Sequence, residues 1–427
     1  MNYKLRMRYY FTVILLITLL AVPWLAVNYP EQTDFAYSVA KGIENSITGS
    51  LASAILARSP KSVQEIQARY TPTSPKKVRV LLVPGHEPGY GGAEYGDLKE
   101  RDINVELADD LARFLNENGR YEVITTRTAT DWNPVFADYF KTHWDEIDAW
   151  QKQARMEARQ MVSVGQLKPA VVPVNHNNVR PDIGLRLFGI TKWANENDID
   201  ITIHIHVNDD PRHNSRVAGE HSGFAIYVPE HQLGNSSTTQ AIAANVFKRL
   251  ERYNPTSDLA VEAGGFIEEP ELIAIGVNNT AAAASMLIEY GYIYEQQFTN
   301  PEVHTQAIND LAFQTYLGLQ DFFGSGNNIT RAYDTLMLPR NFNRQMSKTG
   351  YKPEDVFALQ TALILEGAYP PSATDKNACP RTGRFGPCTE EALAAFQKKH
   401  QITDEKGVVG TKTLGVLNQL YSVNQQK

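Results

Sequence analysis

Short apolar runs alternate with amphipathic helical segments through the middle of this 427-residue chain. The run "KVRVLLVPGH" at 77–86 is typical of a buried strand that leads into a loop, here at Pro84-Gly85. At 104–119, "NVELADDLARFLNENG" has apolar residues at helical spacing and ends in glycine, and a second strand-like run, "YEVITTR", follows at 121–127. This order predicts an α/β domain in which a mostly parallel, twisted sheet is flanked by helices.

The same alternation continues towards residue 325. Further strands are predicted at 200–207, 223–228 and 285–293, and further helices at 238–253 and 303–323. The connection at 131–180 is too long for a simple loop and has a helical pattern, so we expect a helical insertion there. Together these elements predict one domain over residues 77–325.

The N-terminus differs in kind from the rest of the chain. Three basic residues within the first eight precede a run at 9–27 that contains no charged residue. A bilayer-spanning helix needs roughly 20 apolar residues, and a basic flank favours a cytoplasmic N-terminus. We expect an uncleaved transmembrane anchor within residues 1–29, followed by a linker at 30–76. A cleaved signal peptide is the alternative, and both place the remaining chain outside the cytoplasm, in the cell envelope.

A second, smaller domain is expected at 349–423, after a polar linker at 326–348. Three short helical segments separated by glycine-rich turns predict a three-helix unit. Cys379 and Cys388 are the two cysteines of the chain, and in an oxidising compartment we expect them to form a disulfide. Two unpaired thiols are the alternative.

The charge pattern excludes one class of partner. The formal net charge is -7, and no block of lysine and arginine with interleaved aromatic residues is present. Nucleic acid is therefore not an expected partner.

Polar side chains follow the predicted strands at the edge where a ligand crevice is expected. His86, His206 and Glu289 stand at the carboxyl ends of three strands, and the crevice of an open α/β sheet lies beyond those ends. His204 lies on the same face of its strand as His206, so both are candidate ligands. Four carboxylates follow His86, namely Glu87, Glu94, Asp97 and Glu100. A metal hydrolase needs such nitrogen and oxygen ligands, but the pattern alone does not choose among them.

Three segments resemble the signature segments of the zinc-dependent N-acetylmuramoyl-L-alanine amidases, which cut the bacterial cell wall. They are "LLVPGHEPGYGGAEYGDLKERDIN" at 81–104, "ITIHIHVN" at 201–208 and "SMLIEYGYI" at 285–293. The resemblance covers roughly residues 77–323 without the insertion. It implies that His86, Glu100 and His206 bind one Zn²⁺, with water in the fourth position. It also implies that Glu289 takes the proton of that water and later gives one to the leaving amine.

Three further residues are expected to support the site. Asn104 and Asn208 belong to the matched segments, and His204 lies one pleat deeper than His206, where it would act by packing or hydrogen bonding. The chain also departs from the family. Val83 stands where the family commonly has aspartate, His204 stands in place of a small polar residue, and a glycine of the loop after His86 is displaced.

Residues 351–421 resemble the peptidoglycan-binding domain that is often attached to such amidases. The Phe385-Gly386-Pro387 turn and the Phe396-Gln397 pair carry this likeness. Both resemblances together imply a peptidoglycan hydrolase that cleaves the amide between the lactyl group of N-acetylmuramic acid and L-alanine. A zinc peptidase that cuts the stem peptide and a catalytically inactive wall-binding protein are the alternatives.

Overall fold

The computed structural model describes residues 60–168, 180–210, 214, 216–270, 272–275, 281–325, 333–371 and 375–423. The anchor or signal expected at 1–29 lies outside these residues. Within the described part of the chain, no helix is both long and apolar enough to cross a membrane. The described residues belong to one compact unit.

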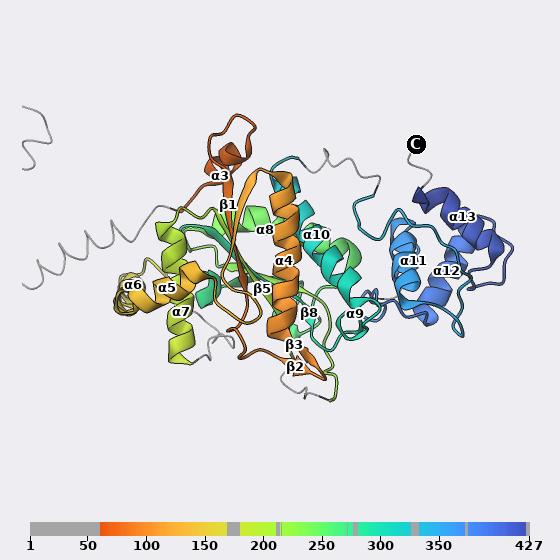
Figure 1. The fold of residues 1–427 in the computed structure, drawn as a ribbon, viewed down its shortest axis with the longest axis horizontal. Helices are drawn as coiled ribbons and strands as arrows, with labels where there is room; N and C mark the ends of the chain where they lie inside the picture. The colour runs from red at the N-terminus through yellow and green to blue at the C-terminus, as the bar shows by residue number, and fades with distance from the viewer. Residues whose placement is uncertain are drawn as a thin grey trace, which may run out of the picture. The chain divides into compact units, whose positions relative to one another are not determined.

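A six-stranded sheet forms the centre of this unit (Figure 1). Its strand order is β4 (Tyr121–Thr125), β1 (Val78–Pro84), β5 (Ile201–Asn208), β8 (Ala284–Tyr292), β6 (Ala225–Pro229) and β7 (Phe266–Glu269). The first four strands run parallel, whereas β6 is antiparallel to β8 and parallel to β7. The predicted mostly parallel sheet is confirmed. The short strands β7, β2 (Glu94–Tyr95) and β3 (Leu98–Lys99) were not predicted, because none of them contains an apolar run.

The helices of the first part of the chain are α3 (Val63–Tyr70), α4 (Glu100–Asn118), α5 (Pro134–Thr142), α6 (Trp144–Ser163), α7 (Pro181–Glu196), α8 (Ser236–Tyr253), α9 (Gln296–Thr299) and α10 (His304–Phe322). The side chains of β5 show which face of the sheet some of these helices cover. Ile201, Ile203 and Ile205 are buried in the core that includes side chains of α4, α8 and α10. Because side chains alternate along a strand, His204 and His206 lie on the opposite face. In Figure 1, α4 lies in front of the sheet.

Three helices, α5, α6 and α7, pack on one another, as Figure 1 also shows. The rings of Phe136 on α5 and Trp193 on α7 lie 4.7 Å apart. The first two helices fall within the predicted insertion at 131–180, which is helical as far as Ser163. On its other side α7 contacts residues 273–275, so this group of helices lies near the sheet face that bears the two histidines.

Parts of both expected linkers are packed against the folded domains. In the first, Ile66 of α3 is fully buried, and Lys61 and Arg69 form ion pairs of 2.6 and 3.0 Å with the buried Asp200. The second contributes four buried side chains to the C-terminal core, those of Met337, Leu338, Phe342 and Met346. Both segments were expected to be linkers, but these described apolar residues are used for packing.

The C-terminal domain contains the three predicted helices, α11 (Pro353–Leu365), α12 (Pro387–Lys399) and α13 (Thr411–Tyr421). Cys379 and Cys388 are joined by a disulfide, with their Cα atoms 5.8 Å apart. The core of this domain continues into the larger domain, because Val303 and Ala307 are part of it. Contacts of buried side chains therefore join the two domains.

A buried ion pair spans this junction. Asp310 on α10 and Arg381 of the C-terminal domain lie 2.5 Å apart, and their side chains are 0% and 1% exposed. We expect Arg381→Met to lower the free energy of unfolding by about 3 to 5 kcal/mol, since it leaves the Asp310 carboxylate buried without its partner. The double substitution Asp310→Leu and Arg381→Met should recover most of this loss. Urea unfolding of the unsubstituted protein and the two variants measures both effects, and equal stability of all three proteins would contradict the prediction.

Candidate metal centre

His86 occupies the loop that follows β1. The backbone N–H of Gly85 donates a 2.8 Å hydrogen bond to the carbonyl of Ile205, which fixes the start of the loop against β5. His86 itself has a φ of 69°, a left-handed conformation that is rare for a residue with a side chain. Such strain persists where the surrounding contacts determine the backbone, and it is typical of functional sites.

Glu100 is the first residue of α4 and is 5% exposed. The helix N-terminus favours its negative charge. Its Oε2 accepts a 2.9 Å hydrogen bond from the backbone of Ala93, while the Nδ2 of Asn104 donates to Oε1 across 3.4 Å. Asn104 therefore contacts a candidate ligand, and its supporting role stays a prediction.

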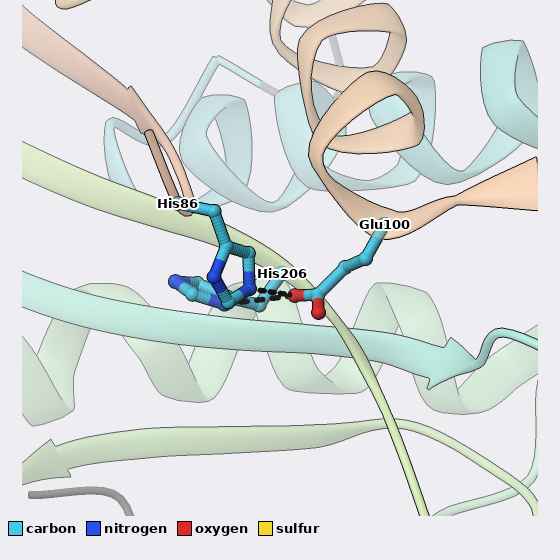
Figure 2. A group of neighbouring side chains, drawn as sticks. All are labelled: His86, Glu100 and His206. Atoms are coloured by element: carbon cyan, nitrogen blue, oxygen red, sulfur yellow. Dashed lines mark hydrogen bonds and ion pairs between the residues drawn. The ribbon is translucent and has the colours of Figure 1, made fainter. Parts of the chain in front are cut away.

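The side chains of His86, Glu100 and His206 converge on one point (Figure 2). Glu100 Oε1 lies 2.7 Å from His86 Nε2 and 3.0 Å from His206 Nδ1. One ligand atom from each of the three residues lies within 4.8 Å of the others. In the described part of the chain, this is the one group of three or more histidine, cysteine and acidic side chains with such spacing.

The donor set fits a Zn²⁺ ion. Two imidazole nitrogens and one carboxylate oxygen are ligands that Zn²⁺ commonly takes in hydrolases. His86 Nε2 is buried, and the Glu100 oxygen that lies 2.7 Å from it is itself a candidate ligand. Burial favours the neutral form of Glu100, but the neighbouring His86 and His206 hold the pKa of its carboxyl well below the ordinary value, so this ligand is ionised.

His204 lies outside this group although it shares the strand face with His206. Its side chain is 2% exposed. Burial, with a smaller contribution from His206, lowers the pKa of His204 to about 3, so the ring is neutral. A neutral ring beside the ligands is compatible with the supporting role that we expect.

Asn208 is hydrogen-bonded to Glu262, a residue that was not predicted from the sequence. Its Nδ2 donates to both carboxylate oxygens of Glu262, at 2.8 and 3.0 Å. Glu262 is 1% exposed and also accepts a 2.6 Å hydrogen bond from the hydroxyl of Tyr227. No periodic pattern marks Glu262, because it lies in a short 3₁₀ turn between elements.

Glu289 lies on β8 directly opposite His206 on β5. It is 5% exposed, and its Oε2 is buried without a hydrogen-bond partner. Burial, together with the negative charges of Glu100 and Glu262, raises the pKa of Glu289 well above the ordinary value. A carboxyl group with a raised pKa is suited to proton transfer near neutral pH.

Comparison with known proteins identifies the family. Residues 80–320 match the family model of N-acetylmuramoyl-L-alanine amidase, and residues 352–417 match that of a peptidoglycan binding domain. The first match spans more than half of the chain. The chain belongs to the N-acetylmuramoyl-L-alanine amidase family. It is therefore a hydrolase that acts on an amide bond of peptidoglycan.

Solved amidase structures are among those similar to this chain, at low sequence identity. The CwlD amidase from Clostridioides difficile in complex with the GerS lipoprotein is 15% identical, with a TM-score of 0.37, and covers 58% of this chain and 99% of its own. AmiC2 of Nostoc punctiforme is 15% identical, with a TM-score of 0.36, and covers 58% of this chain and 97% of its own. Ami1 from Mycobacterium smegmatis is 16% identical, with a TM-score of 0.36, and covers 58% of this chain and all of its own. No curated protein matches the chain.

The candidate ligands of this amidase line a cavity of about 410 Å³. The helix α7 supplies an apolar wall, and Trp132, Leu272 and Ile273 add to it. The wall residues from α7 are Ile183, Leu187 and Ile190. Arg186 of the same helix forms a 3.2 Å ion pair with Glu87, next to His86. This contribution of α7 was not predicted, because no helix was expected at 181–196.

Gly92, in the loop that follows His86, lies against two of the candidate ligands. Gly92 has a φ of 84°, and a Cβ there would lie 2.9 Å from the ring of His86 and 3.1 Å from Glu100 Oε2. The loop therefore passes close to two of the candidate ligands, and the close approach requires glycine.

Gly85 offers a direct test of the packing around His206. A Cβ at this position would lie 2.3 Å from the His206 ring. We expect Gly85→Ala to displace that ring and to weaken zinc binding at least about tenfold. Calorimetric zinc titration measures the effect. Gly350→Ala is the control, because no atom lies within 4 Å of a Cβ at Gly350, and equal affinities in the two variants would contradict the prediction.

Proposed function

We propose that this amidase is a zinc enzyme in which His86, Glu100 and His206 hold one Zn²⁺. The observation that carries the proposal is the convergence of their three ligand atoms, which lie within 4.8 Å of one another. When bound, Zn²⁺ would polarise the scissile carbonyl and lower the pKa of a water molecule towards 7. The ionised Glu100 would balance part of the charge of the ion.

Glu289 carries the proton in this proposal. Its carboxylate accepts a proton from the attacking water, whose oxygen forms a bond to the lactyl carbonyl carbon. As the bond from that carbon to the L-alanine nitrogen breaks, Glu289 returns the proton to the leaving nitrogen. The products are a lactyl carboxylic acid on the sugar and a free amino group on L-alanine. The position of Glu289 opposite His206 and its partnerless Oε2 support this role.

The envelope is the proposed site of action. Peptidoglycan is the substrate of the family and the ligand named for the C-terminal domain. We further propose that residues 9–27 anchor the chain in the cell membrane or, alternatively, serve as a cleaved export signal. The uncharged run and the basic residues before it support this proposal.

Product analysis on purified muropeptides tests the proposed reaction. The zinc-loaded protein should release an intact stem peptide with a free L-alanine amino terminus, detected by mass spectrometry. Cleavage within the stem peptide would instead identify a zinc peptidase. Binding of peptidoglycan without any cleavage would identify an inactive wall-binding protein, and either result would overturn the proposal.

A further inference from the structure

Arg127 is a buried arginine beside the metal centre with an unusual set of partners. It lies two residues beyond the end of β4 and is 1% exposed. Its Nε donates to the carbonyl of Pro84 at 3.1 Å, and its Nη1 donates to the carbonyl of Thr128 at 3.0 Å. Its Nη2 donates to the carbonyls of Gly85 and of Arg101, the latter at 2.9 Å. All four acceptors are backbone carbonyls.

These carbonyls belong to the two segments that present candidate ligands. Pro84 and Gly85 immediately precede His86, and Arg101 immediately follows Glu100. One guanidinium therefore links the exit of β1 to the first turn of α4. It does so from a strand that supplies no candidate ligand itself.

The chemistry of the guanidinium suits this bridging. It presents donors from three nitrogens in one plane, whereas the ammonium group of lysine donates from a single point. Burial lowers the pKa of Arg127 to about 10, which still leaves it charged at neutral pH. A buried charge is costly unless its hydrogen bonds are satisfied, so the four carbonyls and the guanidinium depend on one another.

We infer that Arg127 is a positioning residue that sets the distance between His86 and Glu100 and thereby the affinity of the metal centre. The inference rests on the proposed function, since it takes these two residues as ligands. The left-handed backbone of His86 follows directly after the two carbonyls that Arg127 holds. Losing these bonds would let the loop relax and move the ligand.

Substitution by lysine tests the inference with the full chain. Arg127→Lys keeps the charge and most of the side chain but cannot reach all four carbonyls. We expect zinc affinity, measured by competition with a chromophoric chelator, to fall 10- to 100-fold, the range typical of residues that hold metal ligands in place. The visible absorption bands of the Co²⁺-substituted protein should shift as well, because they report ligand geometry.

Arg381→Lys is the matched control. Arg381 is also 1% exposed on its side chain, but its hydrogen bonds go to Asp310 and Thr361. The Arg381→Lys variant should have a lower unfolding temperature but the same zinc affinity and the same Co²⁺ spectrum as the unsubstituted protein. Unchanged zinc affinity in Arg127→Lys, or an equal loss in both variants, would overturn the inference. If Arg127→Lys does not fold, Arg127→Gln, which keeps two N–H donors, replaces it in the same comparison.

The failure of this inference is distinguishable from failure of the proposed function. If the unsubstituted protein binds no zinc or does not cleave muropeptides at the lactyl amide, the function itself is wrong. If it does both and Arg127→Lys binds zinc equally well, only the role of Arg127 is wrong.

Discussion

Replacing Glu289 by glutamine is expected to lower amide hydrolysis by a factor of about 10² to 10⁴. Glutamine keeps the size of the side chain but can neither accept the proton of water nor return it to the leaving nitrogen. Glu289 is not in the group of converging ligand atoms, so zinc stoichiometry should remain at one per chain. Hydrolysis of muropeptides and zinc content are measured on the same preparation. An active Glu289→Gln protein would exclude Glu289 as the proton carrier.

The same substitution should stabilise the metal-free protein. Burial raises the pKa of Glu289 above its ordinary value of 4.5, so the unfolded chain releases this proton at lower pH than the folded chain. Well below pH 4.5 the Glu289 carboxyl is neutral in both the folded and the unfolded chain, so it does not change the free energy of unfolding. As pH rises towards the folded pKa, ionisation favours the unfolded chain and stability is lost. Glutamine does not ionise, so the Glu289→Gln protein does not lose stability in this way.

Thermal unfolding after zinc removal by a chelator measures the difference. Glu289→Gln should unfold at a higher temperature than the unsubstituted protein at pH 7 to 8, and the gap should narrow towards pH 4. A gap that is independent of pH would show that packing, and not the buried charge, is responsible.

The second large expected effect is a loss of zinc affinity that differs between the two histidines of β5. His206→Ala removes a proposed ligand and should lower zinc affinity by more than about 100-fold, beyond the range typical of residues that only hold ligands in place. His204→Ala should lower it by about tenfold or less, since this ring is not among the converging atoms. Both residues lie on the same strand face, so the pair is a matched comparison. Equal losses would show that both histidines bind the metal.

Strong local patterns explain which parts of the fold could be predicted. The strands β1, β5 and β8 are almost continuously buried, and their many apolar residues are visible in the sequence without knowledge of the neighbouring strands. By contrast, β7 has four residues, none of them buried. It belongs to the sheet through its pairing with β6. Its sequence therefore holds no signal of its own.

The residues of the candidate site also fall into those that the sequence predicted and those that it did not. His86 and His206 stand out because they lie at the carboxyl ends of predicted strands, while the choice of Glu100 among four nearby carboxylates needed the family resemblance. Glu262 and Arg127 were missed for a physical reason. Each acts through hydrogen bonds to residues far away in the sequence, and neither periodicity nor spacing records such contacts.

Crystals of the zinc-loaded protein allow the most direct test of the central claim, through anomalous X-ray scattering at the zinc absorption edge. We predict one strong peak in the catalytic domain, within bonding distance of His86, Glu100 and His206 and beyond bonding distance of His204. A peak bound to His204, or a zinc ion held by other residues while this group stays without one, would contradict the account.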